Sequence, residues 1–321
     1  MTRKLSRIIG GGFLAAALFI IPVNAAPQDF NVDSAIEQYT QTIQRDPTNA
    51  VAYHNRGVSY KMKKQFKKAL EDLTKAVELK PDYSDAYNNR GTVFEVLGKD
   101  DEAFQDYNKA IQVDPGNIVA YNNRGLLYGK KANYEDFAGR KEMAKDLYSK
   151  AIQDFDSAIS ANPNYAESYQ NRAVEFSVTG QHQRAIADFT RAIELGIKTA
   201  EIYNSRGDAY FHLRNHNAAL EDFATAISIN PGYVSTYNNR GMVYLDKGDY
   251  KRAIADFDKV IAEGDADDLL GAWTNRGVCF YNLGDFDQAI KCYENALSIN
   301  QNFKPALVNM EAAYKARGGR R

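Results

Sequence analysis

The chain is built from short stretches in which apolar and small residues recur every three or four positions, the spacing of one face of an α-helix. In residues 50–83, the first such stretch places Tyr53, Gly57 and Tyr60 on one face. A second stretch follows, with a stripe formed by Phe66, Ala69, Leu73 and Ala76. Pro81 ends it, because proline has no amide proton to donate to a further helical turn. The pattern predicts two helices joined by a short turn.

This pair of stretches returns with a period of 34 residues wherever nothing is inserted. Each copy carries a glycine, or once an alanine, preceded by arginine and standing four positions after an aromatic residue. The seven markers are Gly57, Gly91, Gly125, Ala173, Gly207, Gly241 and Gly277. Self-similarity at this period predicts helix-turn-helix units stacked into a solenoid.

Turn signals fall at matching places in the copies. The turns between paired helices contain glycine, which suits the left-handed conformation that often ends a helix; these are Gly98, Gly180, Gly248 and Gly284. Proline ends the second stretch in four copies, at positions 81, 115, 163 and 231.

Taken together, these residues closely resemble the tetratricopeptide repeat family. The resemblance covers residues 33 to about 317, and it departs from the usual family pattern in the arginine before each glycine, where an apolar residue is more common. It implies an all-α, right-handed α-solenoid of antiparallel helix pairs, with a concave groove lined by the first helices and with flanking helices that shield the ends of the stack.

The first 25 residues have a different character. Arg3, Lys4 and Arg7 precede an apolar, small-residue run from Ile8 to Val23, and small residues stand before Ala26. This is the pattern of a secretory signal peptide. The alternative is an uncleaved membrane anchor, for which the run is short. The mature protein is then expected to be periplasmic or secreted, without a membrane span.

The resulting domain organisation has four parts. A signal peptide occupies residues 1–25, and a leading segment with a half-repeat helix occupies 26–49. The seven tetratricopeptide repeats are predicted at 50–83, 84–117, 118–165, 166–199, 200–233, 234–269 and 270–303, followed by a C-terminal capping helix and basic tail at 304–321.

The third repeat is longer than the others by 14 residues. If seven residues are added to each helix, the turn falls at Gly139 and both helices protrude by roughly 10 Å. In the other layout the turn falls at Ala132 and Asn133, and the second helix takes all the extra residues. Either way, residues 133–148 form a projection, which is a spacer or a partner contact.

An arginine beside every close-packed glycine requires a partner, since an unpaired buried charge is costly. A regular aspartate in the second helices is the candidate. Pairing within a repeat would leave Arg276 facing Cys292, so the favoured arrangement joins successive repeats. It pairs Asp72 with Arg90, Asp106 with Arg124, Asp154 with Arg172, Asp188 with Arg206, Asp222 with Arg240, and Asp256 with Arg276.

Six repeats carry an asparagine two positions before the marker, where the first helices are expected to face the groove. A primary amide donates and accepts, so a column of amides can hold an extended backbone. By resemblance to the repeat region of O-linked N-acetylglucosamine transferase, these residues are candidates for peptide binding. The alternative is that each amide bonds neighbouring helices or water. The column comprises Asn55, Asn89, Asn123, Asn171, Asn239 and Asn275.

Composition narrows the function further. The formal net charge is −1, which argues against nucleic acid as the main partner. No catalytic set, cofactor or metal site is expected, because the repeats account for almost the whole chain and the four histidines are scattered. Cys279 and Cys292 are expected to be buried thiols, with a disulfide as the alternative.

These features predict an exported, non-enzymatic scaffold that binds an extended segment of a partner protein in its groove. The alternative is a structural adaptor that binds a folded partner through its convex face or the 133–148 projection. A metal-binding or enzymatic protein is a third possibility.

Overall fold

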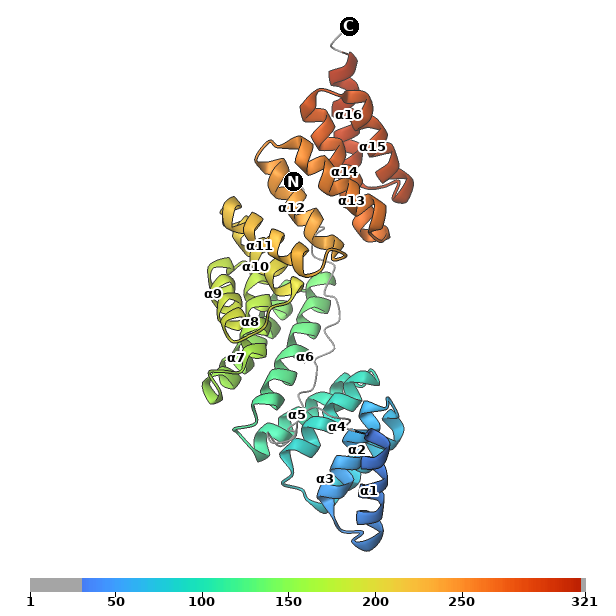
Figure 1. Cartoon of the computed structure of the whole chain (residues 1–321), viewed down its shortest axis with the longest axis vertical. Coiled ribbons are helices and arrows are strands. Elements are labelled where there is room, and N and C mark those ends of the chain that lie inside the picture. Colours follow the sequence, from blue (N-terminus) through green and yellow to red (C-terminus); the bar gives the residue numbers. More distant parts are fainter. Residues whose placement is uncertain (1–30, 319–321) are drawn as a thin grey trace. The chain divides into compact units, whose positions relative to one another are not determined.

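The computed structural model describes residues 31–318, except for the side chains of residues 266–267. The predicted signal peptide and the last three residues of the basic tail lie outside the described residues. Sixteen helices and no strands occur in residues 31–318, so the fold is all-α, as predicted (Figure 1).

The helices form two compact units, one ending at Gln181 and the other beginning at His182. We call their described parts, residues 31–181 and 182–318, the N-terminal unit and the C-terminal unit. The N-terminal unit contains α1 (Val32–Arg45), α2 (Ala50–Met62), α3 (Phe66–Leu79), α4 (Ser84–Val96), α5 (Asp100–Val113), α6 (Ile118–Phe137), α7 (Lys141–Ala161) and α8 (Ala166–Val178). The C-terminal unit contains α9 (His182–Glu194), α10 (Ala200–His212), α11 (His216–Ile229), α12 (Val234–Asp246), α13 (Tyr250–Glu263), α14 (Ala266–Leu283), α15 (Phe286–Ile299) and α16 (Lys304–Gly318).

Local sequence explains where these helices begin and turn. Side chains of Asn49 and Asn117 accept from backbone amides of α2 and α6, both at 2.9 Å, and so satisfy amides that a helix start leaves unpaired. Glycines in the left-handed region join paired helices at positions 98, 139, 180, 248 and 284. Lys64 and Arg214 adopt the same positive φ without glycine, at a backbone cost that glycine avoids.

Within a pair, the marker glycine lets the second helix approach closely. At Gly207, an added Cβ would lie 2.7 Å from Cε1 of Phe223, whose side chain is fully buried. A ring occupies the corresponding place beside Gly91, Gly125, Gly241 and Gly277. In these five helix pairs, an aromatic ring of the second helix therefore fills the space that the missing side chain leaves.

The first and second helices of the repeats differ in what they contact. Within the N-terminal unit α2, α4, α6 and α8 contact one another in sequence, and within the C-terminal unit α10, α12, α14 and α16 do so. Consecutive second helices of the described residues make no comparable contacts inside either unit. The first helices therefore form the more closely packed face of each unit, which we call the first-helix face.

The insertion in the third repeat is shared by both helices. α6 has 20 residues and α7 has 21, against 13 or 14 in α2 to α5. The turn lies at Gly139, with φ +80°. The structure thus selects the first of the two layouts, and α6 and α7 run side by side as an extended hairpin (Figure 1).

Candidate protein-binding face

In five repeats the arginine binds the aspartate of its own repeat. Nε and Nη2 of Arg206 each donate to a different carboxylate oxygen of Asp222 at 2.8 Å. The same fork joins Arg56 to Asp72, Arg90 to Asp106, Arg124 to Asp154, and Arg240 to Asp256. The predicted pairing between successive repeats (Asp72–Arg90, Asp106–Arg124, Asp154–Arg172, Asp188–Arg206, Asp222–Arg240 and Asp256–Arg276) is therefore wrong.

Helix geometry explains the error. The remaining nitrogen, Nη1, does reach the preceding repeat, where Arg206 donates to Thr190 at 3.1 Å and Arg124 donates to Asn108 at 2.6 Å. These acceptors stand two positions after the aspartate of their own helix. Two residues are about 200° of rotation, so the two side chains leave opposite sides of the helix. The aspartate faces its own first helix, while the residue two positions later faces the next repeat.

Two aromatic rings of the same helix contact the guanidinium in six of the seven repeats, and one ring, that of Tyr121, contacts Arg124. Cζ of Arg206 lies 5.6 Å from the ring centroid of Tyr203 and 6.0 Å from that of Tyr210. Residues three before and four after the arginine are neighbours on a helix, so this clamp is local in sequence. Cation–π attraction adds to the ion pair, and the arginine is fixed in place rather than available to a ligand.

The last repeat lacks the carboxylate. Nη1 of Arg276 lies 3.1 Å from Sγ of buried Cys292, and Nε donates to Asp258 at 2.6 Å. Burial raises the pKa of the Cys292 thiol, and the arginine opposes this rise. Pairing within repeats was disfavoured on sequence because it would place Arg276 beside Cys292, and the structure does place these two residues together.

Replacing Cys292 by aspartate should stabilise the C-terminal unit by about 1 kcal/mol, because it restores the charge-assisted fork found in the other repeats. Thermal unfolding followed by circular dichroism measures the change. Cys279→Asp is the matched control: Cys279 is fully buried among Ala253 and Phe257, so the same substitution there should be strongly destabilising. A loss of stability in both variants would contradict the prediction.

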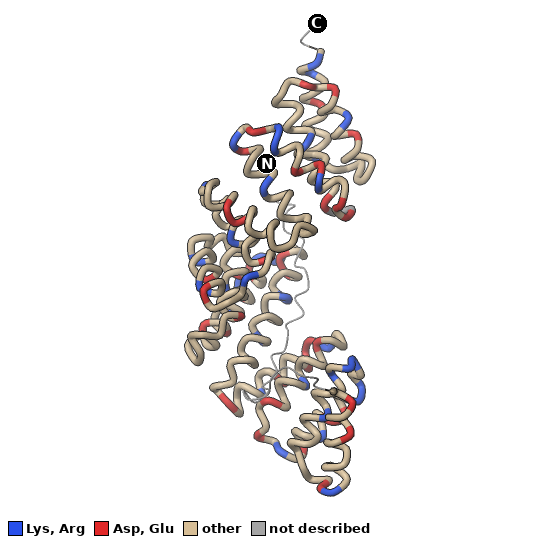
Figure 2. The backbone as a smooth tube through the Cα atoms, viewed as in Figure 1, with Lys and Arg blue, Asp and Glu red and all other residues tan. Residues whose placement is uncertain are grey.

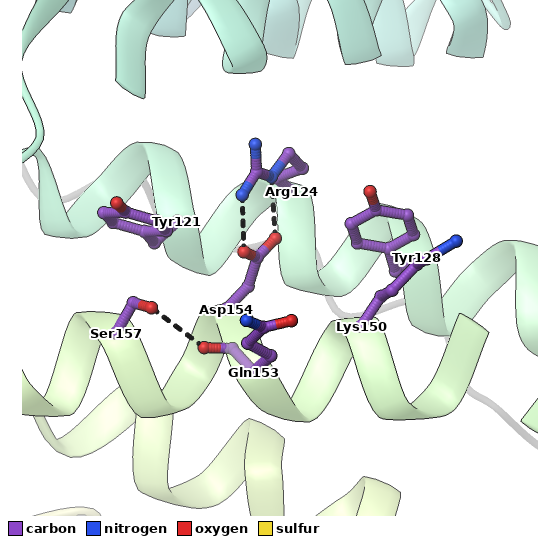
Figure 3. Close-up of a pocket in the computed structure, with 7 residues that line it drawn as sticks. All are labelled: Tyr121, Arg124, Tyr128, Lys150, Gln153, Asp154 and Ser157. Atoms are coloured by element: carbon purple, nitrogen blue, oxygen red, sulfur yellow. Dashed lines mark hydrogen bonds and ion pairs between the residues drawn. The ribbon is translucent and has the colours of Figure 1, made fainter. Parts of the chain in front are cut away.

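The Arg124–Asp154 pair borders an open cavity of about 240 Å³ between α6 and α7 (Figure 3). Ser157 explains the opening, because four other repeats place a long cationic side chain at its position, at Lys75, Lys109, Arg191 and Lys259. The cavity is smaller than the pockets that enclose drug-sized ligands. We regard it as a gap beside the ion pair.

The asparagine column bonds neighbouring repeats. Nδ2 of Asn123 donates to Oδ1 of Asn88 at 2.9 Å, and Nδ2 of Asn171 donates to Oδ1 of Asn122 at 2.9 Å. Similar contacts join Asn89 to His54, Asn239 to Asn204, and Asn275 to the sulfur of Met242. Asn55 differs, because its Oδ1 contacts His54 of the same helix.

Asn123, Asn171 and Asn239 use only their donors in these contacts. Among residues 31–318, no donor reaches the Oδ1 atoms of Asn123, Asn171 or Asn239, although a carbonyl oxygen can accept hydrogen bonds. These three asparagines can offer acceptors to a ligand, rather than the donor and acceptor together that the sequence suggested. Their donors set the register of the first helices.

A polar chain occupies the start of the first-helix face. Nζ of Lys61 donates to Asn89 at 2.7 Å and to Thr92 at 3.1 Å, and Asn89 contacts His54, which contacts the hydroxyl of Tyr83. Burial lowers the pKa of Lys61 to about 8, and burial also lowers the pKa of His54. This cation is bonded to neutral acceptors and does not form a cluster with others.

At the other end of the chain, a cavity of about 260 Å³ lies between α14, α15 and α16. Tyr281, Tyr293 and Asn309 contribute to its lining. It combines apolar surface with hydroxyl and amide groups, which suits a single side chain of a partner better than a complete small molecule.

Comparison with known proteins identifies the family. The model for tetratricopeptide repeats matches residues 50–83, 84–117, 200–233, 234–263 and 271–303, just over half of the chain. The chain belongs to the tetratricopeptide repeat family. A search of curated protein sequences gave no match. Proteins of this family are generally scaffolds for protein–protein interaction.

Solved structures share the fold. The chain is 21% identical to a tetratricopeptide repeat protein from Parabacteroides merdae, with a TM-score of 0.54 over 87% of this chain and 99% of that one. It is 19% identical to the C-terminal part of such a protein from Cytophaga hutchinsonii, with a TM-score of 0.57 over 79% and 98%. It is 18% identical to pilF of Pseudomonas aeruginosa, with a TM-score of 0.55 over 74% of this chain and 96% of that one. At these identities the likeness concerns the fold alone.

The family match omits the third and fourth repeats, and the fourth contains the feature that sequence reasoning missed. Two positions after the marker, the other repeats place a residue without charge. The fourth places Glu175 there, and its side chain is buried. Alignment of the seven copies at this position would have found it.

Within residues 31–318, no group of three His, Cys, Asp or Glu residues could hold a metal ion. Cys279 and Cys292 are buried and unbonded. None of the described helices is long and apolar enough to cross a bilayer. Charges of both signs are spread along the helices (Figure 2).

Proposed function

We propose that this protein is an exported, non-enzymatic scaffold that binds an extended segment of a partner protein along the first-helix face. The observation that carries the proposal is the pair of amide oxygens of the N-terminal unit, on Asn123 and Asn171, that accept no hydrogen bond from the described residues. An apolar side chain follows one helical turn later, at Leu126 after Asn123 and at Val174 after Asn171. Residues three apart share a helix face, so each amide acceptor has an apolar neighbour.

This arrangement suits the chemistry of an extended chain. Backbone amides of the partner would donate to the asparagine oxygens, and its alternate side chains would contact the apolar neighbours. Val174 is 36% exposed and Val96 is 54% exposed, so both have apolar surface to bury. The partner segment would be apolar or mixed, because the lysines of the first helices near these oxygens are already engaged: Lys61 with Asn89 and Thr92, and Lys130 with Asp100.

Export is part of the proposal and rests on residues 1–25. Cell fractionation followed by N-terminal sequencing of the mature protein tests it. A chain found in the cytoplasm with Met1 retained would contradict export without affecting the proposed binding face.

The binding proposal predicts that Asn123→Ala with Asn171→Ala weakens partner capture at least tenfold, since two acceptor contacts would be lost. Crosslinking and affinity capture of the exported protein supply the partner, and titration gives the dissociation constant. Val174→Arg should weaken binding similarly, by covering the face without removing the bonds between repeats. Asn164→Ala, in an exposed turn, is the control. Unchanged binding by the double variant and by Val174→Arg would contradict the proposal.

A second function is favoured by the tip of the α6–α7 hairpin. Tyr134 is 66% exposed, Phe137 is 81% exposed and Met143 is 53% exposed. Nearby charges pair within the hairpin, Glu135 with Arg140 and Asp136 with Lys141. The tip therefore presents apolar surface beside these paired charges, which suits an apolar depression on a folded partner. Loss of binding in Phe137→Ser, with binding retained in the asparagine double variant, would select this function.

A further inference from the structure

Glu175 occupies a position that holds an uncharged residue in each of the other six repeats. Two positions after the marker they place Ser59, Val93, Leu127, Ala209, Val243 and Cys279, all 3% exposed or less. In the N-terminal unit, Val93 packs on Ala69 and Leu73 of the preceding second helix, and Leu127 packs on Ala103 and Tyr107. The position is therefore one where each repeat seats on the one before it, and in the fourth repeat it holds a carboxyl group.

The carboxyl group is buried without a hydrogen-bond partner. Glu175 is 6% exposed, and its Oε2 atom has no partner among the described residues. Burying a carboxylate without compensation is expensive, so such groups tend to bind a proton instead. Burial raises the pKa of Glu175 to about 7, and no other cause contributes.

Space for the carboxyl comes from the preceding repeat. Gly129 of α6 stands four positions after its marker, where Lys61, Glu95, Phe211, Leu245 and Tyr281 occur in other repeats. A Cβ on Gly129 would lie 2.3 Å from Oε1 of Glu175. A missing side chain in α6 thus accommodates an extra polar side chain in α8.

Charged groups on the surrounding helices are engaged elsewhere. The contacts are those of Lys130 with Asp100, Lys131 with Asp101, Arg124 with Asp154, Arg172 with Asp156, and the Tyr148 hydroxyl with Asn133. Of these residues, α6 carries Arg124, Lys130, Lys131 and Asn133, α7 carries Tyr148, Asp154 and Asp156, and α8 carries Arg172. None of these contacts brings a cation of α6, α7 or α8 to the Glu175 carboxyl.

We propose that Glu175 makes the seating of α8 on α6 and α7 depend on proton uptake. With the carboxyl protonated, α8 packs as described. When it ionises, the charge has no partner in place, and α8 separates from α6 so that water can reach the carboxylate.

The direction of the pH dependence follows from linkage. Below pH 4.5 the carboxyl is neutral whether α8 is seated or open. Between pH 4.5 and about 7 the open form ionises more readily, so opening becomes progressively more favourable. Above about pH 7 both forms are ionised and the effect levels off. The packing of α8 on α6 and α7 is therefore most stable at acidic pH.

Hydrogen exchange of the α8 amides in the full chain tests the proposal. Wild type and Glu175→Gln are compared at the same pH, so that the intrinsic dependence of exchange on pH cancels. The wild-type rate divided by the variant rate should increase about 70-fold between pH 5 and pH 8. Glu167→Gln, on the same helix, is the control: the wild-type rate divided by the rate of this variant should not vary with pH. A ratio for Glu175→Gln that does not vary with pH would overturn the proposal.

A second comparison covers the case in which glutamine disturbs folding. Gly129→Ala should accelerate α8 exchange in the wild-type background, because the new methyl group meets the carboxyl. In a Glu175→Val background, which restores the valine of positions 93 and 243, it should have little effect, and exchange should lose its extra pH dependence. Equal effects of Gly129→Ala in both backgrounds would overturn the proposed contact.

Discussion

Replacing Asp222 by alanine is expected to lower the free energy of unfolding of the C-terminal unit by about 3 kcal/mol. The substitution leaves the Arg206 guanidinium between two tyrosine rings without its carboxylate, and removing one partner of a buried pair costs about 3 to 5 kcal/mol. The Arg206 side chain is 16% exposed and that of Asp222 is 7% exposed, so we take the lower end. Denaturant unfolding monitored by circular dichroism measures the loss.

The partner of Asp222 can be established with a double-mutant cycle. Asp222→Ala combined with Arg206→Leu should recover much of the stability, because no unpaired charge remains. Asp222→Ala combined with Arg240→Leu is the matched control, and its effects should add, since Arg240 binds Asp256. If stability were recovered with Arg240→Leu and not with Arg206→Leu, Asp222 would be shown to pair with the arginine of the next repeat.

A similar loss, about 3 to 5 kcal/mol, is expected for Phe257→Ala. The ring of Phe257 is fully buried and fills the space beside Gly241, where an added Cβ would lie 2.8 Å from it. Truncation would leave a cavity at the contact between α12 and α13. In repeat arrays such losses are transmitted mainly to neighbouring repeats, so the effect should be confined to the C-terminal unit.

Hydrogen exchange resolves where the Phe257 effect falls. Protection of α12 to α14 should decrease, while that of α1 to α5 should be unchanged. Tyr250→Ala is a control, because Tyr250 is only partly buried against the same cluster and should cost less. Uniform loss of protection throughout residues 31–318 would contradict the expectation of local behaviour.

Local signals predicted much of the architecture. A 34-residue period placed the helix pairs, since helical spacing of apolar residues and turn-forming glycines are properties of adjacent residues. Lys64 and Arg214 escaped notice because their positive φ follows from the same turn geometry without the usual glycine. The layout of the insertion was left open by sequence, because both arrangements keep the apolar stripes in phase.

What the sequence by itself determined is the identity of the recurring residues: an arginine, an aspartate, an asparagine and a glycine at fixed places in a helix pair. Only the tertiary structure decided their partners. Arg206 bonds Asp222 of its own repeat and Thr190 of the preceding one, since side chains two positions apart leave opposite sides of a helix. Asn171 uses its donor on Asn122, and Glu175 is buried beside Gly129. Both outcomes depend on how closely successive first helices approach, and that distance results from packing of the whole stack.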